Sequence, residues 1–250
     1  MSKVRIDTYD DGVRAIVLND PARRNILAPE LCADLLDAVS SVKADPGTRA
    51  VIVTGEGSAF CGGADMPAIF GDTSRSVAQL RDDLHEVYAS FLSIRDLGVP
   101  VIAAVHGPAV GAGLNLAMVC DVRVAGPDSV FAATFSRIGL HPGGGCTWFL
   151  VQTMGKDKAL KMLLDGGNVK AQQAVDAGVA TVFADDPMAE AMKLASRWSA
   201  IDSQLTRDIK AAVEIAAKSD IATTLEFESW AQASAATKPA LAAYVDTFRK

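Results

Sequence analysis

Two short apolar segments, each followed by a glycine-bearing loop and then by a helical pattern, constrain the fold of this chain most. Residues 51–53 and 99–105 are almost wholly apolar, as strands are when helices cover both faces of a parallel sheet. The loops that follow them span residues 55–63 and 106–113. Strands that alternate with helices in this way indicate right-handed crossovers, so the sequence predicts an α/β fold.

The neighbouring segments fit the same fold class. Residues 4–8 and 13–18 flank an Asp-Asp-Gly turn and predict an N-terminal hairpin. Apolar residues at helical spacing predict one helix that begins at Pro29 and a second around residues 80–92. A further short strand is expected at residues 122–124.

The pattern changes after about residue 196, where helical spacing continues and no strand signal is left. Leu205, Ile209, Val213 and Ala216 repeat at helical intervals, and residues 225–236 continue in the same way. Helices at the end of an α/β chain pack either on their own core or on a neighbouring subunit. The pattern alone leaves both arrangements open.

Composition excludes several classes of function. The 24 Lys and Arg residues against 30 Asp and Glu leave a net charge of −6, so the chain lacks the basic surface that nucleic-acid binding requires. The four cysteines form no Cys-x-x-Cys pair, so we expect neither a metal site nor a disulfide framework. Charges interrupt the N-terminal residues, so we expect no secretory signal and a cytoplasmic protein.

One stretch has the length of a membrane span. Residues 98–120 contain no Asp, Glu, Lys or Arg. Two prolines and several glycines interrupt the stretch, however, and a buried strand followed by a turn and a helix of small residues fits it better. We therefore expect no membrane partner.

The two glycine-bearing loops carry the strongest indication of chemistry. Small residues at 62–64 and 111–113 let a ligand approach the backbone closely. A helix that begins near Ala112 would direct its free N–H groups and its positive dipole end at such a ligand. Two N–H groups that converge on one oxygen form an oxyanion hole. Tight turns and close helix packing are the alternative explanation, and neither loop matches a nucleotide-binding glycine pattern.

Several segments resemble one known family. Residues 59–66 (AFCGGADM) and 105–113 (VHGPAVGAG), the latter followed by LAMVCD at 116–121, are similar to the two loop motifs of the crotonase, or enoyl-CoA hydratase/isomerase, superfamily. PARRN at 21–25 and IGLHPGGG at 138–145 resemble two further segments of that family, in the same order along the chain.

The resemblance implies a spiral of βαβ units with two near-perpendicular sheets and a C-terminal helical region. In these terms residues 1–195 form the core that binds acyl-CoA, and residues 196–250 form a helical region for oligomerisation. A homotrimer or a dimer of trimers is implied as the assembly. An acyl-CoA thioester is implied as the substrate, and no cofactor is needed besides the CoA that it carries.

The resemblance also implies roles for individual residues. The thioester oxygen would lie between the backbone N–H groups of Ala64 and Ala112, and the adenine part would lie against the loop that contains residues 59–65. Arg23 or Arg24 would lie near the CoA phosphates, although ordinary solvated charge is the alternative for both. The implied CoA-binding residues are Arg23, Arg24, Ala59, Cys61, Gly63, Ala64, Asp65, Met66, Gly111, Ala112 and Phe135.

The sequence departs from the family pattern at the catalytic acids. Hydratases of this family use two glutamates that bracket one water, and Asn115 and Phe135 occupy those positions here. Neither side chain transfers a proton, so efficient simple hydration is not expected. His141 is the candidate replacement among the ionisable residues, with His85 and Glu86 as further candidates. Ala64, Ala112, Asn115 and His141 are therefore the catalytic candidates.

Three functions are consistent with these features. The first is an acyl-CoA enzyme of the superfamily, a lyase or isomerase by family, with a reaction other than simple hydration: isomerisation, decarboxylation, C–C cleavage or thioester hydrolysis, each of which develops negative charge on the thioester oxygen. The second is a pseudoenzyme that binds acyl-CoA without turnover. The third is a scaffold whose pocket has no function, although the intact small-residue loops argue against it.

Overall fold

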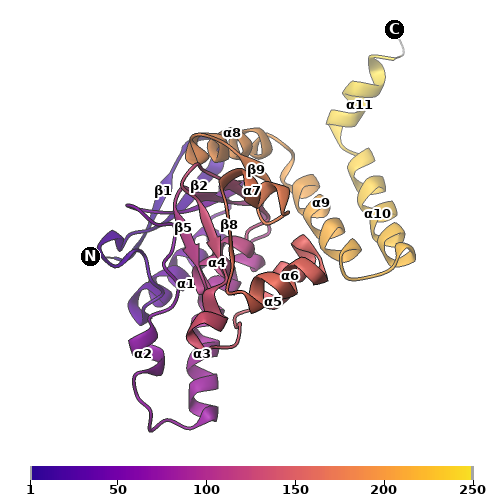
Figure 1. Ribbon diagram of the computed structural model, residues 1–250. Coiled ribbons are helices and arrows are strands. Elements are labelled where there is room, and N and C mark those ends of the chain that lie inside the picture. The colour runs from indigo at the N-terminus through magenta and orange to yellow at the C-terminus, as the bar shows by residue number, and fades with distance from the viewer. Residues whose placement is uncertain (1, 249–250) are drawn as a thin grey trace.

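The computed structural model describes residues 2–248, which form a mixed α/β body with a helical extension at the C-terminus (Figure 1). The strands are β1 (Val4–Thr8), β2 (Val13–Leu18), β3 (Ala50–Gly55), β4 (Val101–Val105), β5 (Pro108–Val110), β6 (Val122–Ala125), β7 (Val130–Ala132), β8 (Asn168–Lys170) and β9 (Val182–Phe183). They form a six-stranded sheet in the order β1-β2-β3-β4-β6-β9 and a three-stranded sheet in the order β5-β7-β8. The predicted α/β class with two sheets is confirmed.

Strand pairing agrees with the pattern of the sequence. β1 and β2 form the predicted antiparallel hairpin, and the remaining strands of the large sheet pair in parallel. In the small sheet β5 and β7 are parallel, whereas β7 and β8 are antiparallel. β4 begins at Val101, two residues later than expected, because the ring nitrogen of Pro100 carries no hydrogen to donate to the ladder.

Helices surround the sheets and then extend the chain. They are α1 (Pro29–Ala44), α2 (Met66–Phe70), α3 (Val77–Leu92), α4 (Ala112–Met118), α5 (Cys146–Met154), α6 (Lys156–Leu164), α7 (Ala171–Asp176), α8 (Pro187–Ser199), α9 (Ser203–Ala216), α10 (Ile221–Ala236) and α11 (Pro239–Asp246). Short 3-10 turns lie at Asp10–Gly12, Pro21–Arg23, Ser93–Asp96 and Thr134–Ile138. None of the helices within residues 2–248 has the length and apolar character needed to cross a bilayer.

The large sheet is buried on both faces, which explains its continuous apolar strands. Alternate residues, among them Ala15, Ile52 and Ala104, pack with α8 in one hydrophobic cluster. The residues between them, among them Ile16 and Val53, belong to the cluster that contains α1 and α4. Because successive side chains of a strand point to opposite faces, both sets must be apolar.

The C-terminal helices contact the body through α9. The Lys210 ammonium lies 2.7 Å from the Asp121 carboxylate, and the Arg95 guanidinium lies 3.0 Å from the Glu214 carboxylate. α9, α10 and α11 contain no buried residue, and α10 and α11 extend away from the body (Figure 1). Helix α8 runs through the predicted boundary at 195/196 and covers the sheet as far as Ser199, so the helices that leave the body begin with α9.

Asn25 holds the loop that follows β3 against the N-terminal part of the chain. Its side-chain oxygen accepts a hydrogen bond from the Asp20 amide at 2.9 Å, and its side-chain nitrogen donates to the Glu56 and Ala59 carbonyls, each at 2.9 Å. Asn25 is fully buried and adopts a positive φ of 55°. Asparagine tolerates that conformation better than most residues, so both its side chain and its backbone fit this position.

We predict that Asn25→Ala destabilises the protein by about 2–4 kcal/mol, because buried backbone groups lose their partners and alanine disfavours the left-handed conformation. Urea unfolding followed by circular dichroism measures this change. Asn168→Ala, at an exposed position of β8, is the control and should change stability by less than about 0.5 kcal/mol. Equal stabilities of the two variants would contradict the role of Asn25.

Candidate active site

The loops that follow β3 and β4 meet as backbone against backbone. The Cys61 amide donates to the Pro108 carbonyl at 3.1 Å, and the Val110 amide donates to the Cys61 carbonyl at 3.0 Å. This parallel bridge joins two segments that lie far apart in the sequence. It brings residues 62–64 of the first loop beside residues 110–113 of the second, as the glycine pattern of the sequence requires.

Glycine is necessary at two positions of this contact. Gly63 has a φ of +105°, and a Cβ there would lie 2.7 Å from the Val110 carbonyl oxygen and 3.9 Å from the Ala112 amide nitrogen. A Cβ at Gly113 would overlap the Cys61 carbonyl group. Any larger residue at either position would therefore separate the two loops.

The amides of Ala64 and Ala112 are free at this contact. The Leu27 amide donates to the Gly63 carbonyl and the Asp65 amide donates to the Leu27 carbonyl, so the Ala64 N–H between them faces away from Leu27. Ala112 is the first residue of α4, where an N–H has no partner within its helix. Neither amide donates a backbone hydrogen bond in the described part of the chain.

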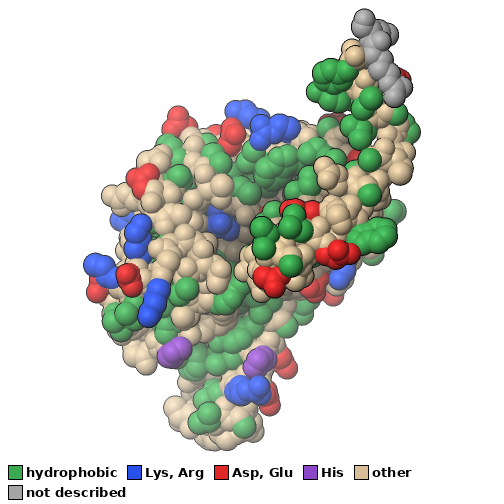
Figure 2. Space-filling model, turned by 90° about the vertical axis from the view of Figure 1, so that its right-hand side faces the viewer, with side chains coloured by type: hydrophobic (Ala, Val, Ile, Leu, Met, Phe, Trp, Pro, Cys, Tyr) green, Lys and Arg blue, Asp and Glu red, His purple; other side chains and the backbone are tan. Residues whose placement is uncertain are grey.

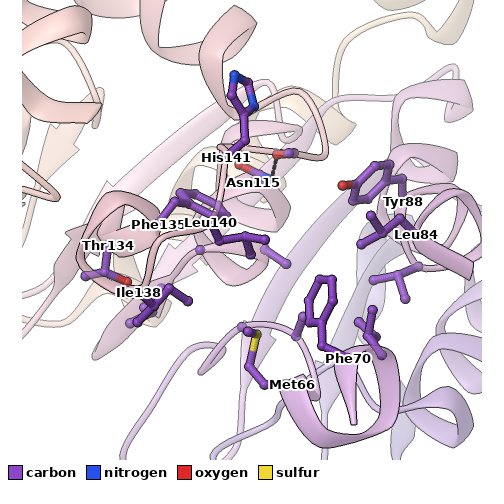
Figure 3. Close-up of a pocket in the computed structure, with 18 of the residues that line it drawn as sticks. Met66, Phe70, Leu84, Tyr88, Asn115, Thr134, Phe135, Ile138, Leu140 and His141 are labelled. Atoms are coloured by element: carbon purple, nitrogen blue, oxygen red, sulfur yellow. Dashed lines mark hydrogen bonds between the residues drawn. The ribbon is translucent and has the colours of Figure 1, made fainter. Parts of the chain in front are cut away.

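A pocket of about 170 Å³ opens beside these amides. Its apolar wall is formed by side chains of α2, α3 and the segment that follows β7, namely Met66, Phe70, Leu84, Phe135, Ile138 and Leu140 (Figure 3). The predicted site residues that line it are Gly63, Ala64, Met66, Gly111, Ala112, Asn115, Phe135 and His141. The pocket therefore unites both loops with side chains from three further segments.

Asn115 and Phe135 lie in the pocket wall, where they provide no carboxylate. Asn115 is 1% exposed and its side-chain nitrogen donates to the Gly143 carbonyl at 2.9 Å. Its side-chain oxygen has no hydrogen-bond partner among residues 2–248. The Phe135 ring lies close to Gly111, since a Cβ at that glycine would be 3.7 Å from it. No Asp or Glu lines the described pocket.

Comparison with known proteins identifies the family. A family model described as enoyl-CoA hydratase/isomerase matches residues 8–248. The chain belongs to this family. The resemblance to the crotonase superfamily that the loop motifs carry is thereby confirmed.

Individual relatives agree with this assignment. The chain is 42% identical over 210 residues to "Probable enoyl-CoA hydratase EchA14" of Mycobacterium tuberculosis, an alignment that covers 84% of this chain and 81% of that protein. It is 36% identical over 189 residues to the 2,3-dehydroadipyl-CoA hydratase of Escherichia coli K12, covering 75% and 72%. The crystal structure of an enoyl-CoA hydratase from Polaromonas sp. JS666 matches with a TM-score of 0.89 at 28% identity, covering 98% and 97%.

The other predicted residues of this family member lie outside the pocket wall. Ala59 and Cys61 are buried in the core, and burial raises the pKa of the Cys61 thiol to about 12, which keeps it protonated at neutral pH. The Asp65 carboxylate lies 2.6 Å from the Arg23 guanidinium and also accepts from the Ala68 amide at the start of α2. Arg24 is exposed, and its side chain makes no hydrogen bond or ion pair within residues 2–248.

The ionisable candidates are only partly in the pocket. His141 lies exposed at its rim, and its Nδ1 is 2.8 Å from the carbonyl oxygen of Pro142. His85 and Glu86 are exposed and do not contribute to the wall. Residues 2–248 contain no group of three or more His, Cys, Asp or Glu side chains that could hold a metal ion.

Tyr88 lines the pocket but was not among the residues predicted from the sequence. It follows Leu84 by one helical turn on α3, so the apolar periodicity of that helix placed it on the inward face. The acid or base candidates that the sequence offers on this helix are His85 and Glu86 instead. In the sequence, a tyrosine among apolar positions at helical spacing indicates a core residue. Only the packing of α3 against the backbone of residues 143–144 shows that the Tyr88 hydroxyl lies at the pocket.

Proposed function

We propose that this protein binds an acyl-CoA thioester and stabilises negative charge on the thioester oxygen with the amides of Ala64 and Ala112. The observation that carries the proposal is the pair of unpartnered N–H groups on two touching loops beside an apolar pocket. Donors already in place act where charge develops, without reorganising during the reaction. Membership of the enoyl-CoA hydratase/isomerase family supports the acyl-CoA substrate class.

The CoA portion would extend from these amides past the loop that contains Met66 toward Arg24. Arg23 is paired with Asp65, whereas the Arg24 guanidinium is free within the described residues and fits a phosphate better. Phe135 and Met66 would contact the apolar part of the ligand. The proposal requires no cofactor besides the CoA of the substrate itself.

The absence of acidic side chains from the described pocket wall limits which reactions of the family this protein would catalyse. Hydration requires an acid and a base around one water, and neither Asn115 nor Phe135 supplies one. Isomerisation, decarboxylation and C–C cleavage would place negative charge on the thioester oxygen as an enolate, and thioester hydrolysis would do so as a tetrahedral intermediate, so all four reactions would use the same two amides. Binding without turnover is the second candidate, and the absence of Asp and Glu from the described pocket wall favours it.

We also propose that the chain assembles as a homotrimer or as a dimer of trimers through its C-terminal helices. The helices α10 and α11 carry large apolar side chains at high exposure, with Ile221 at 77% and Trp230 at 72%. Figure 2 shows hydrophobic side chains both on these helices and on the adjacent face of the body. Apolar surface of this extent favours burial against another subunit.

If the Ala112 amide stabilises the oxyanion, Ala112→Pro should weaken the binding of an enolate more than the binding of an uncharged thioester. Proline at the first position of α4 removes the Ala112 N–H while its ring suits a helix start. Affinity for the enolate of acetoacetyl-CoA should fall by about 10²–10³-fold, and affinity for uncharged butyryl-CoA should fall much less. Isothermal titration calorimetry measures both, with Ala112→Gly as the control that keeps the amide. Unchanged affinity of Ala112→Pro for acetoacetyl-CoA would contradict the assignment.

The neutral pocket predicts slow hydration. Crotonyl-CoA hydration should be at least about 10³-fold slower than in a family member with both glutamates, as followed by the loss of enoyl-thioester absorbance. Either Asn115→Glu or Phe135→Glu alone should recover little, because the two acids act on one water together. The double variant should restore measurable activity. Wild-type hydration at the rate of such a family member would contradict this prediction, and His141→Ala would then test whether His141 supplies the proton transfer.

The exposed C-terminal helices predict an assembly in solution. Multi-angle light scattering at micromolar concentration should give three or six times the chain mass of 26.2 kDa. Burial of the apolar helix faces against neighbouring subunits is the physical reason. A mass of one chain under these conditions would show that the helices pack without a partner.

A further inference from the structure

One side of the pocket is built from two helices that are close in the sequence, α2 and α3. We call their pocket-lining residues the outer wall, namely Met66, Ile69, Phe70, Leu84, Val87 and Tyr88. Figure 3 shows Phe70 and Leu84 of this wall across the pocket from Ile138, which belongs to the segment that follows β7. The position of α2 and α3 therefore decides how much room an acyl group finds between the two sides.

Helix α2 has little packing of its own to hold it in place. It is five residues long and Ile69 is its one buried residue, and so short a helix is marginal in water without further contacts. At its start the Asp65 carboxylate accepts from the Ala68 amide at 3.3 Å. At its other end the last backbone carbonyls have no partner within the helix, so their partners must come from elsewhere.

Arg75 supplies partners at that end. Its guanidinium donates to the Ala68 carbonyl at 3.3 Å and to the Ile69 carbonyl. It also forms an ion pair with the Asp83 carboxylate of α3. A guanidinium carries five N–H donors in a fixed plane, so it can serve several acceptors at once. One side chain thus joins the end of α2 to α3, at the residue before Leu84 of the outer wall.

The start of α3 holds Arg75 in position. The next residue, Ser76, caps the helix: its side chain accepts from the Gln79 amide at 3.3 Å, and the Gln79 side chain accepts from the Ser76 amide at 2.9 Å. The Arg75 side chain is 21% exposed, against 68% for Arg81 of the same helix. Arg75 is therefore an ordered link between the two helices, whereas Arg81 is a solvated charge.

The room beside the outer wall is small and uncharged. A cavity of about 150 Å³ with apolar walls holds benzene, so the pocket of about 170 Å³ has room for about six carbon-sized atoms. No Lys, Arg, Asp or Glu lines the described pocket. A carboxylate placed there would lose its hydration without gaining a cation. The pocket therefore suits a short acyl group that has no charge at its end.

We propose that Arg75 sets the length of the acyl group that the pocket accepts, by holding α2 against α3. With this link in place the pocket admits uncharged acyl groups of about six carbons or fewer. Without it α2 loses its C-terminal partners and moves outward, which leaves room for a longer chain. Arg75 is a positioning residue, since it does not line the pocket and acts through Ile69, Phe70 and Leu84. The inference rests on the proposed acyl-CoA function.

The test measures the affinity of the full chain for saturated acyl-CoA thioesters by isothermal titration calorimetry. The affinity of the wild-type protein should rise by about 2- to 4-fold per methylene from acetyl-CoA to hexanoyl-CoA and then stay level or fall at decanoyl-CoA. Arg75→Ala should raise the ratio of decanoyl-CoA affinity to hexanoyl-CoA affinity by about 10-fold, as two further buried methylenes imply.

Three variants and one further ligand sharpen the test. Arg81→Ala removes an exposed arginine of the same helix and should leave the ratio unchanged. Asp83→Asn removes the partner of Arg75 on α3 and should raise the ratio, with little further effect when combined with Arg75→Ala. Arg75→Lys keeps the charge without the planar donors and should give an intermediate ratio. Adipyl-CoA, which has six carbons and a terminal carboxylate, should bind the wild-type protein at least about 10-fold more weakly than hexanoyl-CoA.

The role of Arg75 would be overturned, with the proposed function intact, by either of two results. One is a wild-type affinity that rises steadily up to decanoyl-CoA. The other is an unchanged ratio in both Arg75→Ala and Asp83→Asn, including equal weakening of both thioesters, which is what a purely structural link would give. Equal binding of adipyl-CoA and hexanoyl-CoA would overturn the selection against charge. Failure of the wild-type protein to bind any of these thioesters would refute the acyl-CoA function itself.

Discussion

The direct contact between two backbone loops is the constraint on which the rest of this site depends. The Cys61–Ala109 bridge can form only if no side chain stands between the loops, and Gly63 and Gly113 meet that requirement. Once the loops touch, the amides of Ala64 and Ala112 are held by strands and a helix start instead of by flexible segments. Rigid placement of this kind is what allows backbone donors to act on developing charge.

The same pocket presents two free backbone amides, and no Asp or Glu lines its described wall. Backbone amides come from the fold itself and do not change when side chains are substituted, whereas acids and bases depend on single residues. Asn115 and Phe135 therefore leave the pocket wall without carboxylates and do not disturb the contact between the two loops. Membership of the enoyl-CoA hydratase/isomerase family accordingly defines the substrate class better than it defines the reaction.

The C-terminal helices present a different physical problem from the core. Polar contacts link α9 to the body: the Lys210 ammonium pairs with the Asp121 carboxylate and also donates to the Val99 carbonyl at 3.0 Å. α10 and α11 bury no residue within the chain, although their sequences are rich in apolar side chains. The fold of the single chain thus leaves unsatisfied the hydrophobic burial on which helix stability in water depends.

The sequence by itself determined the elements whose signal is local. The apolar run of β4, the Asp-Asp-Gly turn between β1 and β2 and the periodicity of α3 each lie within one segment, and the loop motifs sufficed for the family. Only the tertiary structure decided which side chains share the pocket. Tyr88 and Asn115 both lie against the backbone of residues 143–144, and the Arg23 guanidinium is paired with the Asp65 carboxylate. Such contacts depend on how distant segments pack.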